Sequence, residues 1–388
     1  MKTRKATKAA MVALSLLLAS SSAGRAQGFL NPGGGGLDPK FCENKALRQT
    51  AVYVDDMMMR DGATGWANTL FDKLKATLVP GERVSVIELS PADGQSHETW
   101  NGCWPDYSAG QKQKLAAGYS FFSRDPLKAV SDQQKLFAHA FGSALASIYD
   151  AHHRADITID ASNPPHKAIV SALSSDGARY AQTQVTVRAV VYSDLAENSD
   201  IGSVFRPLPK PPVNYGRKLG TFLRSSVVYA FGVDGDVHGG DDIQTMTRDF
   251  WTAALGSMST TIGGFGSDLN IPNALPVAAY DYTVDLKASG QPLTGRLSLL
   301  VDADGGLVDS WIGISRLSSA AVNGTMKCGV NGSTTCTVNA TTSHGIVTDS
   351  PSEALVLRGS TDKPLSGTIG VAGSDLRLPV TATPIADR

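Results

Sequence analysis

Two apolar stretches, far apart in the sequence, each run directly into an aspartate. Residues 50–54 (Thr-Ala-Val-Tyr-Val) precede Asp55, and residues 185–193 (Val-Thr-Val-Arg-Ala-Val-Val-Tyr-Ser) precede Asp194. Short stretches that are apolar on both faces are typical of central strands in a parallel sheet. Because ligands of open α/β sheets bind at the carboxyl ends of the strands, we expect both carboxylates to lie at one edge.

Helical patterns alternate with strand patterns from about residue 45 to residue 270. Leu70, Leu74 and Leu78 recur at every fourth position and predict a helix over 64–78. This alternation favours a doubly wound, mostly parallel sheet with helices on both faces, which is an α/β domain. The other expected helices are 125–150, 163–172, 217–224 and 243–258, and the other expected strands are 83–89, 156–159 and 226–231.

Beyond Pro272 the sequence changes character. Helical spacing disappears, and short segments of alternating apolar and polar residues are separated by turn-forming residues. This pattern indicates an all-β domain, which we expect to be a small sandwich. We therefore divide the folded part of the chain into an α/β domain over 45–270 and an all-β domain over 277–388, joined by a proline-containing link.

The first residues have the pattern of a secretory signal. Basic side chains within residues 2–8 precede an apolar run over 9–19 and then small residues. That run is too short to span a bilayer, which takes about 20 residues. We expect a signal peptide at 1–26, a glycine-rich flexible lead at 27–44, and a periplasmic or secreted bacterial protein with no transmembrane segment after cleavage.

The charge balance bears on the kind of partner. Without residues 1–26 the chain holds 30 basic and 36 acidic residues, a net charge of −6. No cluster of lysine or arginine stands out, and binding to phosphates needs one. Nucleic acid is therefore not expected as a partner.

Four cysteines remain in the predicted exported chain. An even number in an oxidising compartment favours disulfide bonds. The simplest pairing is local, with Cys42 bonded to Cys103 and Cys328 bonded to Cys336 across a turn-forming segment. A zinc site is the alternative, but the cysteines lack the close spacing and the histidine partner that such sites use.

The alternation of elements, the first strand ending in Asp55 and the segment 191–199 (Val-Tyr-Ser-Asp-Leu-Ala-Glu-Asn-Ser) together resemble the von Willebrand factor type A (vWA) domain family. The likeness covers roughly residues 45–270. In that family an Asp-x-Ser-x-Ser motif, a later aspartate and a loop threonine hold a divalent cation that a partner's carboxylate completes. The resemblance implies Asp55 and Asp194 as ligands of Mg²⁺ or Ca²⁺.

The chain departs from the family motif at the serine positions. Met57 and Met59 stand there, and counting from Asp56 instead gives Met58 and Arg60. Mg²⁺ and Ca²⁺ take oxygen ligands, so a thioether is the wrong partner for either ion. We interpret the metal motif as degenerate.

The sequence contains no nucleophile elbow, phosphate loop or His-Glu-x-x-His motif. We therefore favour a protein that is not an enzyme, namely a protein-binding or adhesion-type module that acts through the carboxyl edge of a vWA-like sheet. The alternatives are a metal-dependent hydrolase that uses the acidic strand-end loops and a structural subunit of an envelope or secretion assembly. The predicted partner surface consists of Asp56, Ser193, Asn198, Asp234 and Asp236.

Two further groups have structural interpretations. His152 and His153 end a long predicted helix, where cationic side chains interact favourably with the helix dipole, so we expect a helix terminus there rather than metal ligands. Trp100 and Trp104 fall in a predicted loop. We expect them to anchor the core, with an exposed binding surface as the alternative.

Overall fold

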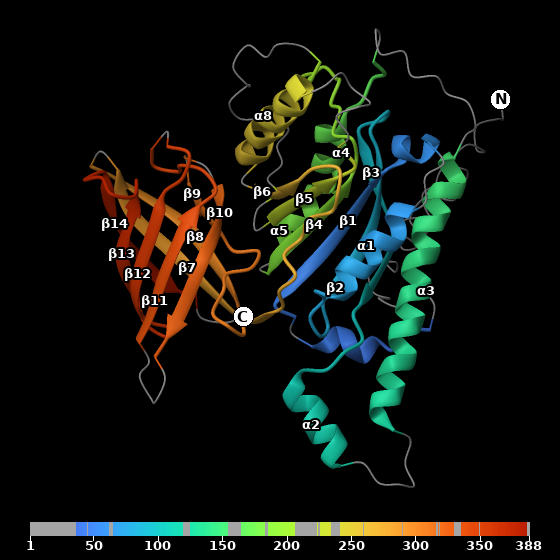
Figure 1. Cartoon of the computed structure of the whole chain (residues 1–388), viewed down its shortest axis with the longest axis horizontal. Coiled ribbons are helices and arrows are strands. Elements are labelled where there is room, and N and C mark those ends of the chain that lie inside the picture. The colour runs from blue at the N-terminus through green and yellow to red at the C-terminus, as the bar shows by residue number, and fades with distance from the viewer. Residues whose placement is uncertain are drawn as a thin grey trace, which may run out of the picture.

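The structure is a computed structural model that consists of an α/β domain and a β-barrel lying side by side (Figure 1). It describes residues 36–385 apart from 45, 62–64, 119–124, 154–163, 183–184, 206–222, 224–225, 234–240, 259, 289, 316, 318, 330–334 and 349. Within these described residues, the helices are too short or too polar to cross a membrane.

A six-stranded sheet forms the centre of the α/β domain. All neighbouring strands are parallel except the edge strand β3, which is antiparallel to β2. This order is that of a doubly wound sheet, and it confirms the predicted mostly parallel architecture. Across the sheet the strands are β3 (Gln95–Cys103), β2 (Arg83–Ser90), β1 (Arg48–Asp55), β4 (Thr186–Tyr192), β5 (Ser226–Phe231) and β6 (Thr261–Phe265).

Helices cover both faces of this sheet. Ala51 and Tyr53 of β1 point into the core below α4 (Ile169–Ser175), α5 (Gly177–Gln182) and α8 (Asp241–Ser257). Val52 and Val54 point into the opposite core, below α1 (Gly65–Lys75) and α3 (Pro126–His152). Because both faces of β1 are covered, the strand is apolar from Ala51 to Val54, and its carboxylate, Asp55, comes at its end.

Helix α3 is the longest element and runs along the sheet (Figure 1). It begins after Asp125, whose side chain accepts a hydrogen bond from the backbone N–H of Leu127 at 2.9 Å. It continues to His152, the terminus expected from the two histidines. This length carries His152 to the carboxyl end of β1, where α3 packs on the 3-10 helix η3 (Asp56–Asp61).

Several features of the α/β domain differ from the expectations. The predicted loop around Trp100 is the edge strand β3, and the Trp100 ring packs against Phe137 with centroids 5.1 Å apart. Trp104 is buried, so the two tryptophans do not form an exposed surface. The elements α2 (Ala109–Ala117), α5, β6 and η2 (Pro39–Glu43) were not predicted. The predicted strand 156–159 lies outside the described residues, as does most of the predicted helix 217–224.

The second domain is a closed antiparallel barrel, not a sandwich. A sandwich would leave the first and last strands as edges, but here β14 pairs with β7 and β9 joins β8 to β10. Apolar side chains that alternate along each strand fill the interior. The barrel strands are β7 (Pro276–Ala288), β8 (Gln291–Asp302), β9 (Trp311–Ile314), β10 (Ser319–Cys328), β11 (Thr335–Thr342), β12 (Ala354–Ser360), β13 (Leu365–Gly370) and β14 (Arg377–Pro384).

Both predicted disulfides are present. The bond between Cys42 and Cys103 links η2 to the end of β3, with Cα atoms 5.2 Å apart. The bond between Cys328 and Cys336 joins directly opposed residues of β10 and β11. The described residues contain no free cysteine.

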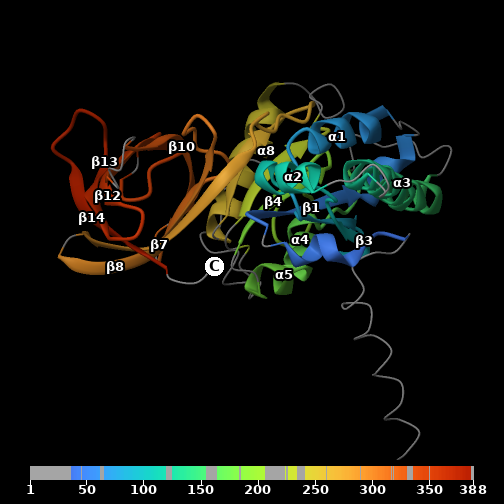
Figure 2. The same cartoon turned by 90° about the horizontal axis from the view of Figure 1, so that it is seen from below.

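The barrel lies beside the α/β domain in Figure 2, and it contacts the amino-terminal ends of β1 and β4. Arg48, the first residue of β1, forms a buried ion pair with Asp309 of the barrel. Tyr229 donates a hydrogen bond to the same carboxylate at 2.5 Å, and Thr186 lies 3.0 Å from Ser298 between their hydroxyl oxygens. The barrel therefore lies at the opposite end of the strands from Asp55 and Asp194.

Candidate functional site

The carboxyl edge of the sheet brings the two predicted aspartates to one lysine. Asp55 is the last residue of β1, and Asp194 lies in the loop that follows β4. The Nζ atom of Lys167 is 2.8 Å from Asp55 Oδ2 and 2.7 Å from Asp194 Oδ1. Lys167 and Asp55 are both buried. The cluster is therefore a three-residue ion network in which one ammonium serves two carboxylates.

Hydrogen bonds hold the two carboxylates in this orientation. The Ser193 hydroxyl donates to Asp55 Oδ2 at 2.7 Å, and the backbone N–H of Met57 donates to Asp55 Oδ1 at 3.0 Å. The backbone N–H of Ala196 donates to Asp194 Oδ1 at 2.9 Å. Asp55 is thus held by groups from the ends of both β1 and β4, and Asp194 by its own loop, in an arrangement that favours a cation between them.

Asn198 positions the loop that carries Lys167. The backbones of Lys167 and Asn198 exchange two hydrogen bonds, of 2.9 and 2.8 Å. The Asn198 side chain donates to the carbonyl oxygens of Pro164 and Pro165 at 3.0 and 3.1 Å. The segment after β4 therefore clamps the loop before α4 and brings the lysine to the strand ends.

The charge state of the network follows from its burial and its charges. Burial alone would lower the pKa of Lys167, but Asp55 and Asp194 outweigh it and raise that pKa above its ordinary value. Burial also raises the pKa of Asp55, whereas Lys167 and Ser193 act in the opposite direction. Lys167 is therefore charged at neutral pH and acts as the counter-ion of both carboxylates.

The residues at these strand ends do not fit Mg²⁺ or Ca²⁺. Such ions take six or more oxygen ligands, whereas the centre between the two carboxylates holds the Lys167 ammonium. Met57 contributes a backbone N–H, and the Met59 side chain is buried in the apolar core. The serine positions of the family motif thus supply no oxygen here.

The predicted partner surface is only partly exposed. Ser193 is fully buried beneath the network, and Asp56 is nearly so. Asn198 is half-buried in its role as a clamp. Asp234 and Asp236 lie outside the described residues. These residues therefore form the support of the carboxyl edge more than its outer surface.

Exposed aspartates nevertheless surround this edge. Asp93 lies in the turn after β2, Asp200 in the loop after β4 and Asp268 after β6, and all three are exposed. Each follows the carboxyl end of a different sheet strand. Among the described residues, the rim of the edge thus carries three exposed aspartates, while its buried centre contains Lys167.

A second group of side chains lies beside the network. His152 Nε2 is 2.8 Å from Glu88 Oε1, and His152 Nδ1 is 3.9 Å from Asp56 Oδ2. Burial raises the pKa of Asp56, and its hydrogen bond with Ser90 opposes this shift. His152 ends α3 as expected, but it also joins the ends of two strands.

A buried acid supports the same loop. Glu197 is fully buried and accepts a hydrogen bond from the backbone N–H of Val170, in the first turn of α4, at 2.9 Å. Ser199 donates to its other carboxylate oxygen. Burial raises the pKa of Glu197 to about 7. The loop that positions Lys167 therefore contains a group that titrates near neutral pH.

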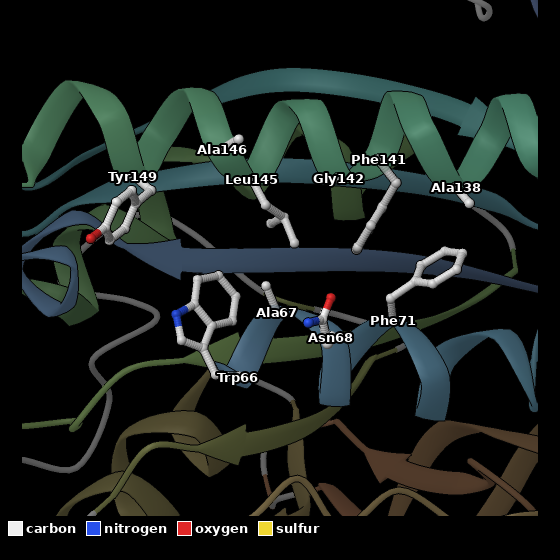
Figure 3. A pocket seen from close by; sticks show the side chains of 10 residues that line it. All are labelled: Trp66, Ala67, Asn68, Phe71, Ala138, Phe141, Gly142, Leu145, Ala146 and Tyr149. Atoms are coloured by element: carbon white, nitrogen blue, oxygen red, sulfur yellow. The ribbon is translucent and has the colours of Figure 1, made fainter. Parts of the chain in front are cut away.

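A groove of about 320 Å³ lies between α1 and α3 (Figure 3). Aromatic and aliphatic side chains dominate its lining, with Trp66 and Phe71 on α1 facing Leu145 and Tyr149 on α3. Trp66 stacks on Tyr192, the last residue of β4, with ring centroids 4.1 Å apart. The groove suits an apolar side chain and offers no cluster of titratable groups for catalysis.

No family model and no curated protein matches the sequence. Among solved structures, the chain is similar to the ArnB paralog VWA2 from Sulfolobus acidocaldarius, with 8% identity and a TM-score of 0.31, over 81% of this chain and 65% of that chain. It is also similar to the human COPII-coat protein Sec24c, with 8% identity and a TM-score of 0.31, over 87% of this chain and 44% of that chain.

The chain thus spans less than two thirds of the length of either matched protein. At a TM-score of 0.31 neither likeness carries an argument about this chain. The order and direction of its own strands define the α/β fold.

Sequence reasoning missed Lys167 and the role of His152. A weak signal for Lys167 exists, because it is a single basic residue between Pro165 and the apolar start of a helix at Ile169. A lone charge entering an apolar stretch needs a buried partner. No comparable signal pairs His152 with Glu88, since 64 residues separate them in the chain.

Proposed function

We propose that this chain is an exported, non-catalytic protein-binding module of the vWA-like type that works without a divalent cation. The observation that carries the proposal is the Lys167 ammonium between Asp55 and Asp194. A vWA-like site recognises a partner's carboxylate through a metal ion. A buried lysine neutralises the strand ends but has no free coordination position, so recognition falls to the surrounding surface.

The described part of that edge presents acidic side chains. Asp93, Asp200 and Asp268 are exposed around it, and the half-buried Asn198 adds polar atoms. Complementary charge increases the association rate and the specificity of binding. We therefore expect a protein partner with a basic surface, bound in a salt-dependent manner. The two disulfides are in keeping with an oxidising compartment such as the periplasm.

The barrel leaves this edge accessible. Its buried contacts are with the amino-terminal ends of the strands, through Arg48 and Thr186. We propose that the barrel serves as a rigid support for the α/β domain. The hydrolase alternative would use an ion at Asp55 and Asp194, and Lys167 occupies that place.

Site-specific photocrosslinking in intact cells tests the proposal. A photoreactive residue replaces Asp200 at the carboxyl edge, and a matched control replaces the exposed Asp375 between β13 and β14. We expect a discrete protein adduct from position 200 only, unchanged by EDTA and weakened by high salt. Loss of the adduct in EDTA, or equal adducts at both positions, would contradict the proposal.

A further inference from the structure

Three side chains from separate elements meet beside the Lys167 network without taking part in it. Asp56 comes from η3, Glu88 from β2 and His152 from the last residue of α3. One ligand atom from each lies within 4.8 Å of those from the other two. We propose that Asp56, Glu88 and His152 form a binding site for a divalent transition-metal ion of the Zn²⁺ class.

The donor atoms are close enough to approach a common ion, since one from each residue lies within 4.8 Å of the other two. Glu88 contacts Nε2 of the His152 ring at 2.8 Å and Asp56 faces Nδ1 at 3.9 Å, so an ion would use one of these ring nitrogens together with the two carboxylates. Ligands that each bind zinc at about 2.0–2.2 Å lie roughly 3–4 Å from one another. The imidazole now shares a hydrogen bond with Glu88. An ion would take the place of that bridging proton, after a small turn of the ring or of the Glu88 carboxylate.

The charges of the group also call for a cation. Among the described residues, neither Asp56 nor Glu88 forms an ion pair with a lysine or arginine, in contrast to Asp55 and Asp194. A divalent ion would neutralise both carboxylates at once.

Partial exposure gives an ion a route to the group. The side chains of Asp56, Glu88 and His152 are 12, 18 and 32% exposed. Three protein ligands that are partly accessible leave one or more coordination positions for water, as in open zinc sites. The ligands come from η3, β2 and α3, and these three elements pack on one another. The site would therefore bind an ion without a large rearrangement of the backbone.

The donor set selects the class of ion. One imidazole nitrogen and two carboxylate oxygens suit Zn²⁺, Co²⁺ or Mn²⁺ better than Ca²⁺, which prefers six to eight oxygen ligands. This site is distinct from Asp55 and Asp194, whose centre is filled by Lys167. The inference does not depend on the protein-binding proposal.

Calorimetric titration of the purified, tag-free protein with ZnCl₂ at pH 7.5 tests the site. We expect one ion per chain, and a loss of affinity of at least tenfold in each of His152→Gln and Glu88→Gln. The matched control is His139→Gln, which alters an exposed histidine on the same helix and should leave the affinity unchanged.

A second measurement keeps the test independent of variant stability. Co²⁺ added to the unmodified protein should give visible absorption bands that ZnCl₂ abolishes by displacement. Absence of stoichiometric Zn²⁺ binding to the unmodified protein would overturn the inference. Equal affinity in folded His152→Gln and His139→Gln variants would also overturn it. Neither result would affect photocrosslinking at position 200, so the two proposals fail separately.

Discussion

Lys167 Nζ lies 2.8 Å from Asp55 Oδ2, and the two side chains are 4% and 0% exposed. An ammonium thus occupies the centre of a strand-end site that a vWA-like sequence pattern would assign to a divalent cation. The ammonium brings one charge where such an ion brings two, and it remains covalently attached to the chain. The carboxyl edge is therefore neutralised in part by a side chain of the protein itself.

Removing this charge should destabilise the fold in a way that reveals the latent ion site. Lys167→Met keeps the bulk but leaves Asp55 and Asp194 without a counter-ion, and breaking such a buried pair costs about 3–5 kcal/mol. Lys167→Ala should cost a similar amount but leaves space between the carboxylates. The free energy of unfolding, measured by urea titration, should show both losses.

The two variants should differ in their response to Ca²⁺ or Mg²⁺. Only Lys167→Ala should regain stability, by about 1.4 kcal/mol at a tenfold excess of ion over its Kd. Lys167→Met is the matched control, because its side chain fills the space. Recovery in both variants, or in neither, would contradict the view that Lys167 stands in the place of the cation.

The interface between the two domains should depend on Asp309. Burial alone would raise the pKa of this carboxyl, but Arg48 and Arg188 outweigh it and hold the pKa below its ordinary value. Asp309→Ala leaves the fully buried Arg48 without this partner and should cost about 3–5 kcal/mol in urea unfolding.

The variant Asp309→Asn separates the effect of the lost charge on stability from the effect of the backbone conformation at this position. Asp309 has a φ of 49°, a left-handed conformation that asparagine tolerates better than alanine. We expect Asn to lose most of the stability that Ala loses and to recover about 1 kcal/mol through the backbone. Stability equal to that of the unmodified protein in Asp309→Asn would show that the ion pair with Arg48 contributes little.

The sequence was sufficient for features that depend on local patterns. The apolar runs before Asp55 and Asp194 predict β1 and β4, and the leucine spacing predicts α1, because each pattern reflects burial on known faces. The sequence did not predict that the second sheet closes into a barrel. Closure depends on β14 pairing with β7, and alternation along a strand is the same in a sandwich and in a barrel.

In the site, too, some residues could be predicted from local patterns and others could not. The strand-end acids are visible in the sequence because topology alone brings them together. Lys167 comes from a loop whose path is set by its backbone pairing with Asn198, and His152 meets Glu88 because of the way α3 packs along the sheet. Neither placement leaves a periodic signal in the residues around it.

The two disulfides should contribute unequally to stability. The bond between Cys42 and Cys103 spans 61 residues, and that between Cys328 and Cys336 spans 8. Loop-closure entropy predicts contributions of about 4 and about 2.5 kcal/mol respectively. Double serine variants of each pair, compared by urea unfolding under non-reducing conditions, should show this order. A larger loss from the shorter loop would mean that native packing, not chain entropy, dominates.

Glu197 should make the stability fall as the pH rises towards neutrality. Burial raises its pKa from 4.5 to about 7, so between these values the native state holds a proton that the unfolded state has lost. Stability from this group is complete below pH 4.5 and decreases by roughly 3 kcal/mol by pH 7.5. Glu197→Gln imitates the protonated form, so its stability relative to the unmodified protein should rise by that amount over the same interval in urea unfolding.

Asp200→Asn, an exposed change in the same loop, is the control. A difference between Glu197→Gln and the unmodified protein that does not vary with pH would show that the carboxyl is ionised in the native state throughout.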